Sequence, residues 1–368
     1  MKRSKPRDRR AASGRLTKSI GGGQTPQRRS RATLRDVANV AGVSPMTVSN
    51  LINGRLLGNM RRETQVRIEA AIKRLGYRPH TMARNLRLDK QLSIGMIIID
   101  DAAHYLADPF TTHIVAGLSN QLNSRGYALL LQGLSADGFR TSPLIRDIRT
   151  DAVCVLLSGP TAVRRRIVET LLGLGQPVVA FQERFKFPGR DICLIRQADR
   201  EGGRSVAQEV LKLGARRLVM LVPEVEWPAI AERVMGVREE IRATGGGRGL
   251  RVVKCGQADF RDTQDALARD IEENGLPGAI LAGNDQMGIA AMKLMAARGL
   301  KVPKDIAITG FNAFEFWQYT DPVLTTVRSP AYEMGAQGGE EILQRLTNGR
   351  FDKSEFVFPV DLQPGAST

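Results

Sequence analysis

Apolar positions along the chain follow two periods, and each period predicts a different element. From residue 93 onwards, short apolar runs alternate with stretches in which apolar residues recur every three or four positions. The first pattern is typical of buried strands and the second of amphipathic helices. Strands are predicted at Ile94–Ile99, Ala128–Leu131, Val153–Leu157, Pro177–Phe181, Arg217–Val222, Ala279–Leu281 and Ile306–Thr309. Helices are predicted at Thr112–Arg125, Gly202–Leu213, Ala231–Ala243, Thr263–Glu273 and Gln286–Arg298. This alternation favours parallel sheets covered by helices on both faces.

Before residue 80 the apolar spacing is helical. Thr33 is a candidate N-cap, with Asp36 at the position that a longer Glu fills in a full capping box. The first helix has an apolar face made of Leu34, Val37, Ala38 and Ala41. Gly42 ends this helix, and Ser44 with Pro45 begins a second one that runs to about Asn53. A third helix is predicted from Glu63 to Leu75, with Val66, Ala70 and Leu75 facing inward. Two short helices around a Gly-Val turn predict a helix-turn-helix, and an ordinary αα-hairpin is the alternative.

The outward face of the second helix favours the helix-turn-helix. Its side chains are short or uncharged and suit base edges: Met46, Thr47, Ser49 and Asn50. Arginines surround it at positions suited to phosphates: Arg35, Arg55, Arg61 and Arg62.

Charge divides the chain in the same place. The formal net charge is +16; residues 1–31 carry +10, residues 32–92 carry +7 and residues 93–368 carry −1. A basic head on a neutral body suggests a polyanion partner for the head alone. Residues 1–31 hold almost nothing apolar, so we predict a disordered basic arm. The arm either adds non-specific phosphate contacts or is a solvated tail, which an upstream start assignment would also produce.

Several classes of protein are disfavoured. No apolar segment of signal-peptide type follows the basic start, and no run of about 18 apolar residues occurs, so we expect a cytoplasmic protein without a membrane span. Three distant cysteines (Cys154, Cys193 and Cys255) suit a reducing compartment and make no zinc site by themselves. HExxH, P-loop, GxSxG and GxGxxG motifs are absent, so no metal, cofactor or catalytic residue is expected.

The N-terminal motifs closely resemble the lac-repressor/galactose-repressor family of bacterial transcription regulators. They are Thr33-Leu34-Arg35-Asp36-Val37-Ala38, Ala41-Gly42-Val43-Ser44, Thr47-Val48-Ser49 and Leu75-Gly76-Tyr77-Arg78-Pro79. The resemblance implies that the helix from Ser44 to Asn53 enters the major groove of an operator. It also implies a hinge helix after Pro79, in which Leu86 wedges into the minor groove; a core leucine is the alternative. The implied DNA-binding residues are Thr33, Arg35, Ser44, Pro45, Met46, Thr47, Ser49, Asn50, Asn53, Tyr77, Arg84 and Leu86.

Asn50 departs from the family, which most often has a basic residue there. Asparagine reads adenine best, through N6 and N7, so the preferred base pair is expected to differ from the usual one. Pro45 and Met46 carry no side-chain donor, which favours apolar readout of thymine methyl groups at their positions.

The body resembles the effector domain of the same family, which is similar to periplasmic sugar-binding proteins. The matching pieces include Asp108-Pro109-Phe110, Arg233 with Gly236, Asn284-Asp285-Gln286, Asp305-Ile306, Gly310-Phe311 and Leu324-Thr325-Thr326. The expected fold is an N-terminal all-α helix-turn-helix domain plus an α/β effector domain of two doubly wound parallel-sheet subdomains, periplasmic-binding-protein-like. Predicted boundaries are 1–31 for the arm, 32–79 for the helix-turn-helix, 80–92 for the hinge and linker, and 93–368 for the effector and dimerisation domain. Within the last, the subdomains are about 93–196 plus 315–340, and 197–311 plus 341–362.

The resemblance places a small molecule in the cleft between the subdomains. The candidate effector-binding residues are Asp100, Phe110, Gln182, Arg233, Asn284, Asn312, Trp227 and Trp317. For Arg233 the alternative is a surface ion pair with Glu232 or Glu239, and for the aromatic residues it is a core role. Most of the family has an aspartate where this chain has Asn312, and the loss of that carboxylate favours an anionic effector such as a sugar acid.

The sequence therefore predicts a repressor that binds a near-palindromic double-stranded operator as a homodimer and answers to a sugar, a sugar acid or a related metabolite. Whether the effector releases DNA or promotes binding stays open, as does tetramer formation. The rivals are a solute-binding protein without a transcriptional role and a sugar-processing enzyme.

Overall fold

The computed structural model describes residues 32–52, 60–77, 91–100, 105–142, 145, 150–245, 247–256 and 260–368. Contacts within the chain divide it into two compact units, residues 1–84 and residues 85–368. The predicted arm therefore lies outside the described residues, as do the predicted hinge helix with Arg84 and Leu86, and Asn53.

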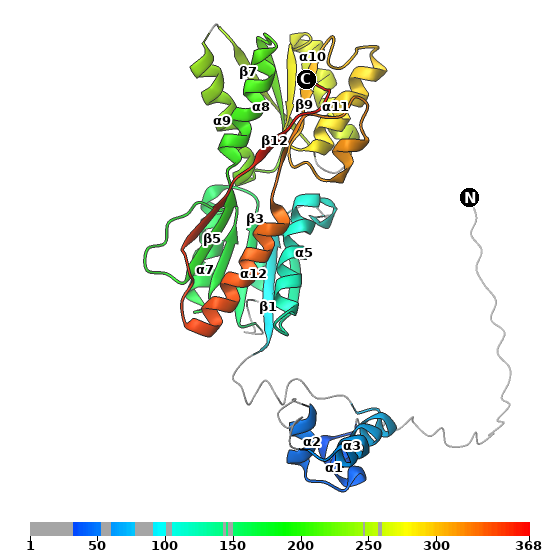
Figure 1. Cartoon of the computed structure of the whole chain (residues 1–368). Helices are drawn as coiled ribbons and strands as arrows, with labels where there is room; N and C mark the ends of the chain where they lie inside the picture. Colours follow the sequence, from blue (N-terminus) through cyan, green and yellow to red (C-terminus); the bar gives the residue numbers. More distant parts are fainter. Residues whose placement is uncertain are drawn as a thin grey trace, which may run out of the picture. The chain divides into compact units, whose positions relative to one another are not determined.

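The first unit is a three-helix domain (Figure 1). Its helices are α1 (Leu34–Ala41), α2 (Pro45–Ile52) and α3 (Arg62–Leu75). Thr33 and Asp36 form a complete capping box, so the short aspartate is long enough to reach the Thr33 amide, at 2.7 Å. Gly42 ends α1 with φ of 65°, a left-handed conformation that glycine adopts without steric cost. The helix-turn-helix prediction is confirmed in its elements.

The core of this unit shows that the predicted inward face of α3 was partly wrong. Ile68 and Ala71 are buried, whereas Val66 is 56% exposed and Ala70 is also on the surface. Residues three or four positions apart share a helix face, so Ile68, Ala71 and the partly buried Leu75 form one stripe to which Val66 does not belong.

The second unit contains two α/β subdomains (Figure 1). In the first, a six-stranded sheet has the order β11-β5-β4-β3-β1-β2, and every neighbouring pair is parallel. Its strands are β1 (Ser93–Ile99), β2 (Ala128–Leu134), β3 (Ala152–Leu157), β4 (Val178–Phe181), β5 (Ile192–Gln197) and β11 (Glu355–Phe358). Its helices are η1 (Tyr105–Ala107), α5 (Pro109–Asn123), η2 (Gly138–Thr141), α7 (Thr161–Gly173) and α12 (Ala331–Asn348).

The second subdomain has a four-stranded parallel sheet of order β7-β6-β8-β9 and a two-stranded antiparallel pair, β10-β12. The strands are β6 (Arg217–Pro223), β7 (Gly249–Cys255), β8 (Ala279–Ala282), β9 (Ala307–Thr309), β10 (Thr326–Arg328) and β12 (Asp361–Gln363). The helices are α8 (Asp199–Lys212), α9 (Pro228–Thr244), α10 (Phe260–Asn274), α11 (Asp285–Ala297) and η3 (Glu315–Tyr319).

Alternate side chains of each central strand pack against different helices. In β1, Ile94, Met96 and Ile98 lie in the core beneath α5 and α12, while Ile97 and Ile99 lie in the core beneath α7. In β6, Leu218 and Met220 pack towards α8 and α9, and the intervening residues pack towards α10 and α11. Both sheets are thus covered on both faces, as the continuous apolar runs predicted.

The chain crosses between the subdomains three times. The structure divides residues 315–362 between the subdomains differently from the prediction. All of α12 packs in the first subdomain, against α5, β4 and β5, and β11 pairs with β5 there. In contrast, η3 and β10 belong to the second subdomain. The predicted boundary at residue 340 was wrong because it cut α12, whose apolar spacing is interrupted by glycines and was not read as a helix. Strands β5, β7, β10 and β11 and helix α7 were also missed.

Candidate functional site

The outward surface of α2 carries the residues predicted to read base edges. Ser44 caps this helix, since its Oγ accepts the Thr47 amide at 3.1 Å, and the two hydroxyls lie 2.8 Å apart. Val48 is fully buried and holds the helix against α1 and α3. Met46 is 65% exposed, and Ser49 and Asn50 are partly exposed. The helix therefore presents an uncharged, accessible face while its opposite side packs in the core.

Three other predicted DNA-binding residues lie on the surface of the same unit. Thr33, Arg35 and Pro45 are exposed. Tyr77, by contrast, is only 9% exposed and packs in the core of the domain. Its contact with DNA stays a prediction.

A cleft lies in the second unit, where the carboxyl ends of strands from both sheets face each other. It encloses about 570 Å³, open solvent included. Seven of the eight predicted effector-binding residues line it: Asp100, Phe110, Gln182, Trp227, Arg233, Asn284 and Asn312. Asp100 directly follows β1, Gln182 follows β4 and Asn284 follows β8, so sheet topology alone brings them together. A smaller adjoining cavity of about 280 Å³ is lined by Asp108, Asn284, Asp285, Asn312 and Phe314, among others.

The aromatic candidates divide by position. Trp227 and Phe110 line the cleft and also pack against the core of the first subdomain. Trp317, in η3, packs against the core of the second subdomain and is absent from the lining of the cleft. The position of Trp317 therefore fits a core role, the alternative to effector binding.

Arg233 is held inside the protein by four contacts rather than by a surface ion pair. Its guanidinium donates from Nε to Asp199 Oδ1 at 2.8 Å, from Nη1 to the Gly283 carbonyl at 2.6 Å and from Nη2 to Asn312 Oδ1 at 3.3 Å. Its plane lies over the Phe311 ring, with 3.6 Å from Cζ to the centroid. Both Arg233 and Asp199 are 3% exposed. The positive charge at the wall of the cleft is thus already neutralised by a buried carboxylate.

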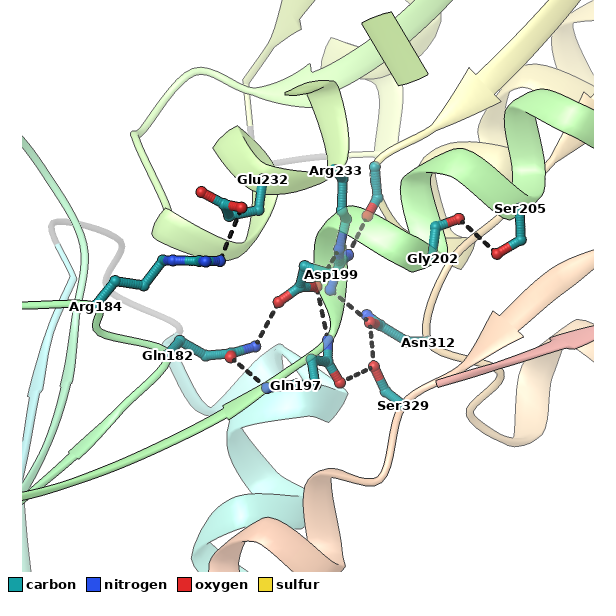
Figure 2. A network of polar contacts seen from close by, with 11 residues as sticks. Gln182, Arg184, Gln197, Asp199, Gly202, Ser205, Glu232, Arg233, Asn312 and Ser329 are labelled. Carbon is teal, nitrogen blue, oxygen red and sulfur yellow. Dashed lines mark hydrogen bonds and ion pairs between the residues drawn. The ribbon is translucent and has the colours of Figure 1, made fainter. Parts of the chain in front are cut away.

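The same carboxylate joins Arg233 to a network at the subdomain crossovers (Figure 2). Asp199 accepts hydrogen bonds from the amides of Gln182 (3.2 Å) and Gln197 (2.8 Å). The Ser329 hydroxyl lies 2.8 Å from Gln197 Oε1 and 3.1 Å from Asn312 Oδ1. Gln197 and Asp199 lie at the first crossover and Ser329 at the second, so cleft-lining side chains bond directly to the segments that connect the subdomains.

Two cleft residues have left-handed backbone. Gln182 has φ of 62° and Asn312 has φ of 109°, and neither is glycine. Such conformations cost about 1–3 kcal/mol each and persist where the surroundings over-determine them. Here backbone bonds hold them: the Gln182 amide donates to Ile195 O at 2.8 Å, and the Asn312 amide donates to Val327 O at 2.8 Å. This strain places both side chains at the cleft.

Burial alters the acids around the cleft. It raises the pKa of Asp199, although Arg233 opposes the shift. It also raises the pKa of Asp108, against hydrogen bonds from Thr111 and Phe110 at the start of α5. Burial also raises the pKa of Asp285, to about 7, despite the bond from the Thr326 hydroxyl. These groups are costly to keep charged, which is common at functional sites.

Comparison with known proteins identifies the two units. Residues 33–80 match the family described as bacterial regulatory proteins, lacI family, and residues 207–368 match the periplasmic binding protein-like domain. The chain belongs to the lacI family. It is a DNA-binding transcription regulator with a periplasmic-binding-protein-like domain.

Relatives of this lacI-family chain match it along nearly its whole length. It is 27% identical to the HTH-type transcriptional regulator CelR of Thermobifida fusca, over 91% of this chain and 98% of that one. It is also 27% identical to the ribose operon repressor of Escherichia coli (strain K12), over 91% and 100%. A crystal structure of the lac repressor dimer bound to operator and the anti-inducer ONPF shares the fold, with a TM-score of 0.77, 22% identity and coverage of 92% and 99%.

Two residues of the site were not predicted from the sequence. Asp199 and Ser329 were not predicted as site residues, because their partners Arg233 and Gln197 are 34 and 132 positions away. The expectation that Asn312 favours an anionic effector took no account of Asp199, whose carboxylate already pairs with Arg233. A signal for Asp108 does exist: an aspartate before Pro109 is typical of a helix N-cap.

Proposed function

We propose that this chain is a homodimeric repressor that binds a near-palindromic operator and releases or tightens it when a small molecule enters the cleft. The observation that carries the proposal is the cleft itself. It gathers buried polar side chains from both subdomains and connects them by hydrogen bonds to the crossovers. A ligand that contacts Arg233, Asn312 and Gln182 together would bias the angle between the subdomains, which is the differential interaction that allostery requires.

For the operator, we propose that α2 reads the major groove through Met46, Thr47, Ser49 and Asn50. Their exposure and their lack of charge support this role, and the exposed Arg35 of α1 suits a phosphate. Arg84 and Leu86 remain predictions for the minor groove. No described helix has the length and apolar content that a membrane crossing requires.

For the dimer, two observations give support. A helix of eight residues reads too few base pairs for genomic specificity, so twofold repetition is expected. In addition, β2 lies at an edge of its sheet and exposes Leu130 (38%), and Leu106 of η1 is 41% exposed. Apolar side chains at a strand edge suit a second copy of the chain.

The test is selection of a binding site from random duplexes with the full chain, followed by affinity measurements at rising salt. We expect a palindromic site and a steep loss of affinity with salt, because counterions are released from phosphates. Asn50→Ala should relax the preference at one symmetric base pair by about 1–3 kcal/mol, whereas Gln65→Ala on α3 should not. Failure to enrich any sequence over random duplex would refute the operator proposal.

A further inference from the structure

The cleft has an uneven charge, and this bears on the ligand that it takes. Arg233 is the only basic side chain among the described residues that line it. Its charge is compensated by Asp199 at 2.8 Å, and both groups are almost completely buried. An incoming carboxylate would therefore have to share the guanidinium with a carboxylate that is already bonded to it.

Two further carboxyl groups line the same cleft, Asp100 and Asp108. Asp108 accepts hydrogen bonds from the Thr111 amide (3.1 Å), the Thr111 hydroxyl (2.9 Å) and the Phe110 amide (3.4 Å). These donors are neutral, so they orient the Asp108 carboxyl group, and a cation beside it would favour the charged form that burial alone disfavours. Asp199 does not line the cleft but is bonded to Arg233, which does. Counting Asp199, the described residues at the cleft include three acids and one base.

The rest of the wall suits a flat, partly apolar ligand. The rings of Trp227 and Phe110 lie on the lining together with Leu156 and Ile230. An aromatic face attracts a cation as well as the apolar face of a sugar ring. Polar groups able to bond hydroxyls are present in Gln182, Asn284 and Asn312.

From these contacts we propose that the cleft takes a polyhydroxylated ligand that carries a protonated amine, of the amino-sugar class, and rejects the corresponding sugar acid. The inference rests on the proposed effector role of the cleft. The amine would lie towards Asp108 and Asp100, on the first subdomain, and the hydroxyls towards Asn284, Asn312 and the unshared N–H groups of Arg233. A ligand held in this way contacts both subdomains at once.

The experiment measures thermal unfolding and calorimetric binding of the full chain with three matched series. Each series has a hexose, its 2-amino-2-deoxy form and its uronate, built on glucose, galactose and mannose. We expect the largest shift from an amino form, with the uronate of that series at least about tenfold weaker, as for loss of a charged hydrogen bond. A larger shift from a neutral hexose or a uronate overturns the proposal, as does no shift in any series.

Variants separate the charge argument from folding. Asp108→Asn keeps an N-cap acceptor for α5 and should reduce the advantage of the amino form by about tenfold. Asp199→Asn leaves Arg233 without its carboxylate partner and should move the preference towards the uronate. Asp265→Asn, an exposed position on α10, should change nothing. An unchanged preference in both cleft variants contradicts the proposal.

Operator-binding measurements on the same preparations distinguish a wrong ligand class from a wrong effector role for the cleft. If a neutral hexose or a uronate alters operator affinity, the cleft is an effector site with a different charge preference, and only this inference fails. If a bound amino sugar leaves operator affinity unaltered, the proposed effector role fails while the ligand class holds.

Discussion

The Arg233–Asp199 pair lies where the cleft meets the first crossover between subdomains. Desolvating two charges is expensive, so such a pair contributes little net stability, yet removing one partner leaves a buried charge without compensation. Arg233 also supports the strained residue Asn312 through its Nη2. The pair therefore serves the geometry of the cleft more than the stability of the fold.

At this residue scale we expect Arg233→Ala to destabilise the second unit by about 3–5 kcal/mol, because Asp199 remains buried and unpaired. The double variant Arg233→Ala with Asp199→Ala should cost less than the sum of the two single variants, since it leaves no lone charge. Urea unfolding of the four proteins in this cycle measures the coupling. Additive effects would show that the two groups do not depend on each other.

Asp285 predicts a dependence of stability on pH. Its pKa is raised from 3.8 to about 7, so between these values the folded protein keeps a proton that the unfolded chain has lost. Stability should therefore fall as pH rises through this window and level off above it. Asp285→Asn still accepts the Thr326 hydroxyl and should remove this component, by about 1 kcal/mol or more. Urea unfolding of both proteins from pH 5 to 8 measures it; parallel curves would contradict the shift.

At the element scale, helix pairs approach so closely that only glycine fits between them. A Cβ at Gly335 of α12 would lie 2.1 Å from the Ile114 carbonyl oxygen of α5. A Cβ at Gly236 of α9 would meet the backbone of α8 in the same way. Backbone atoms cannot move aside as side-chain ends can, so these contacts set the distance between the helices of each subdomain.

Gly335→Ala should therefore destabilise the second unit by about 2 kcal/mol or more, since overpacking forces backbone shifts. Gly173→Ala, in α7, is the matched control because its Cβ would meet nothing within 4 Å. That substitution should be neutral or stabilising by up to about 1 kcal/mol, as alanine favours a helix. Midpoints of thermal unfolding compare the two; equal midpoints would refute the close packing.

At the scale of the whole molecule, charge and chemistry are separated along the chain. Residues 1–31 carry 11 basic side chains and one acid, whereas residues 93–368 carry 32 basic and 33 acidic. Non-specific attraction to a polyanion thus belongs to the first quarter, while the body is close to neutral. The uncharged side chains of α2 are the ones suited to distinguish sequences.

Removing residues 1–31 should lower affinity for every duplex and reduce the dependence of affinity on salt, because fewer phosphate counterions are released. The ratio between the selected site and a random duplex should stay the same. Fluorescence anisotropy at about 50 to 300 mM salt measures the salt dependence of affinity and the ratio of the two affinities. A changed ratio would assign sequence reading to the arm.

The sequence by itself determined the elements with strong local signals. Apolar runs located β1, β3, β6 and β8, and caps located α1 and α2, because burial on both faces and helix termini both leave a pattern within a few residues. It also placed Asp100, Gln182 and Asn284 at strand ends, which parallel topology brings to one edge. Strand β5 was missed although Ile192–Ile195 is a continuous apolar run, and helix α12 was missed because glycines interrupt its apolar spacing.

Only the tertiary structure decided what Arg233 bonds to. Asp199 lies 34 positions earlier, and Ser329 and Gln197 are 132 positions apart, so no local pattern records these contacts. The same holds for the left-handed backbone of Gln182 and Asn312 and for the burial of Tyr77. Local preferences depend on nearby residues, whereas the charge of a cleft depends on which side chains the fold brings together. The partners of Arg233 are therefore a property of the packed molecule.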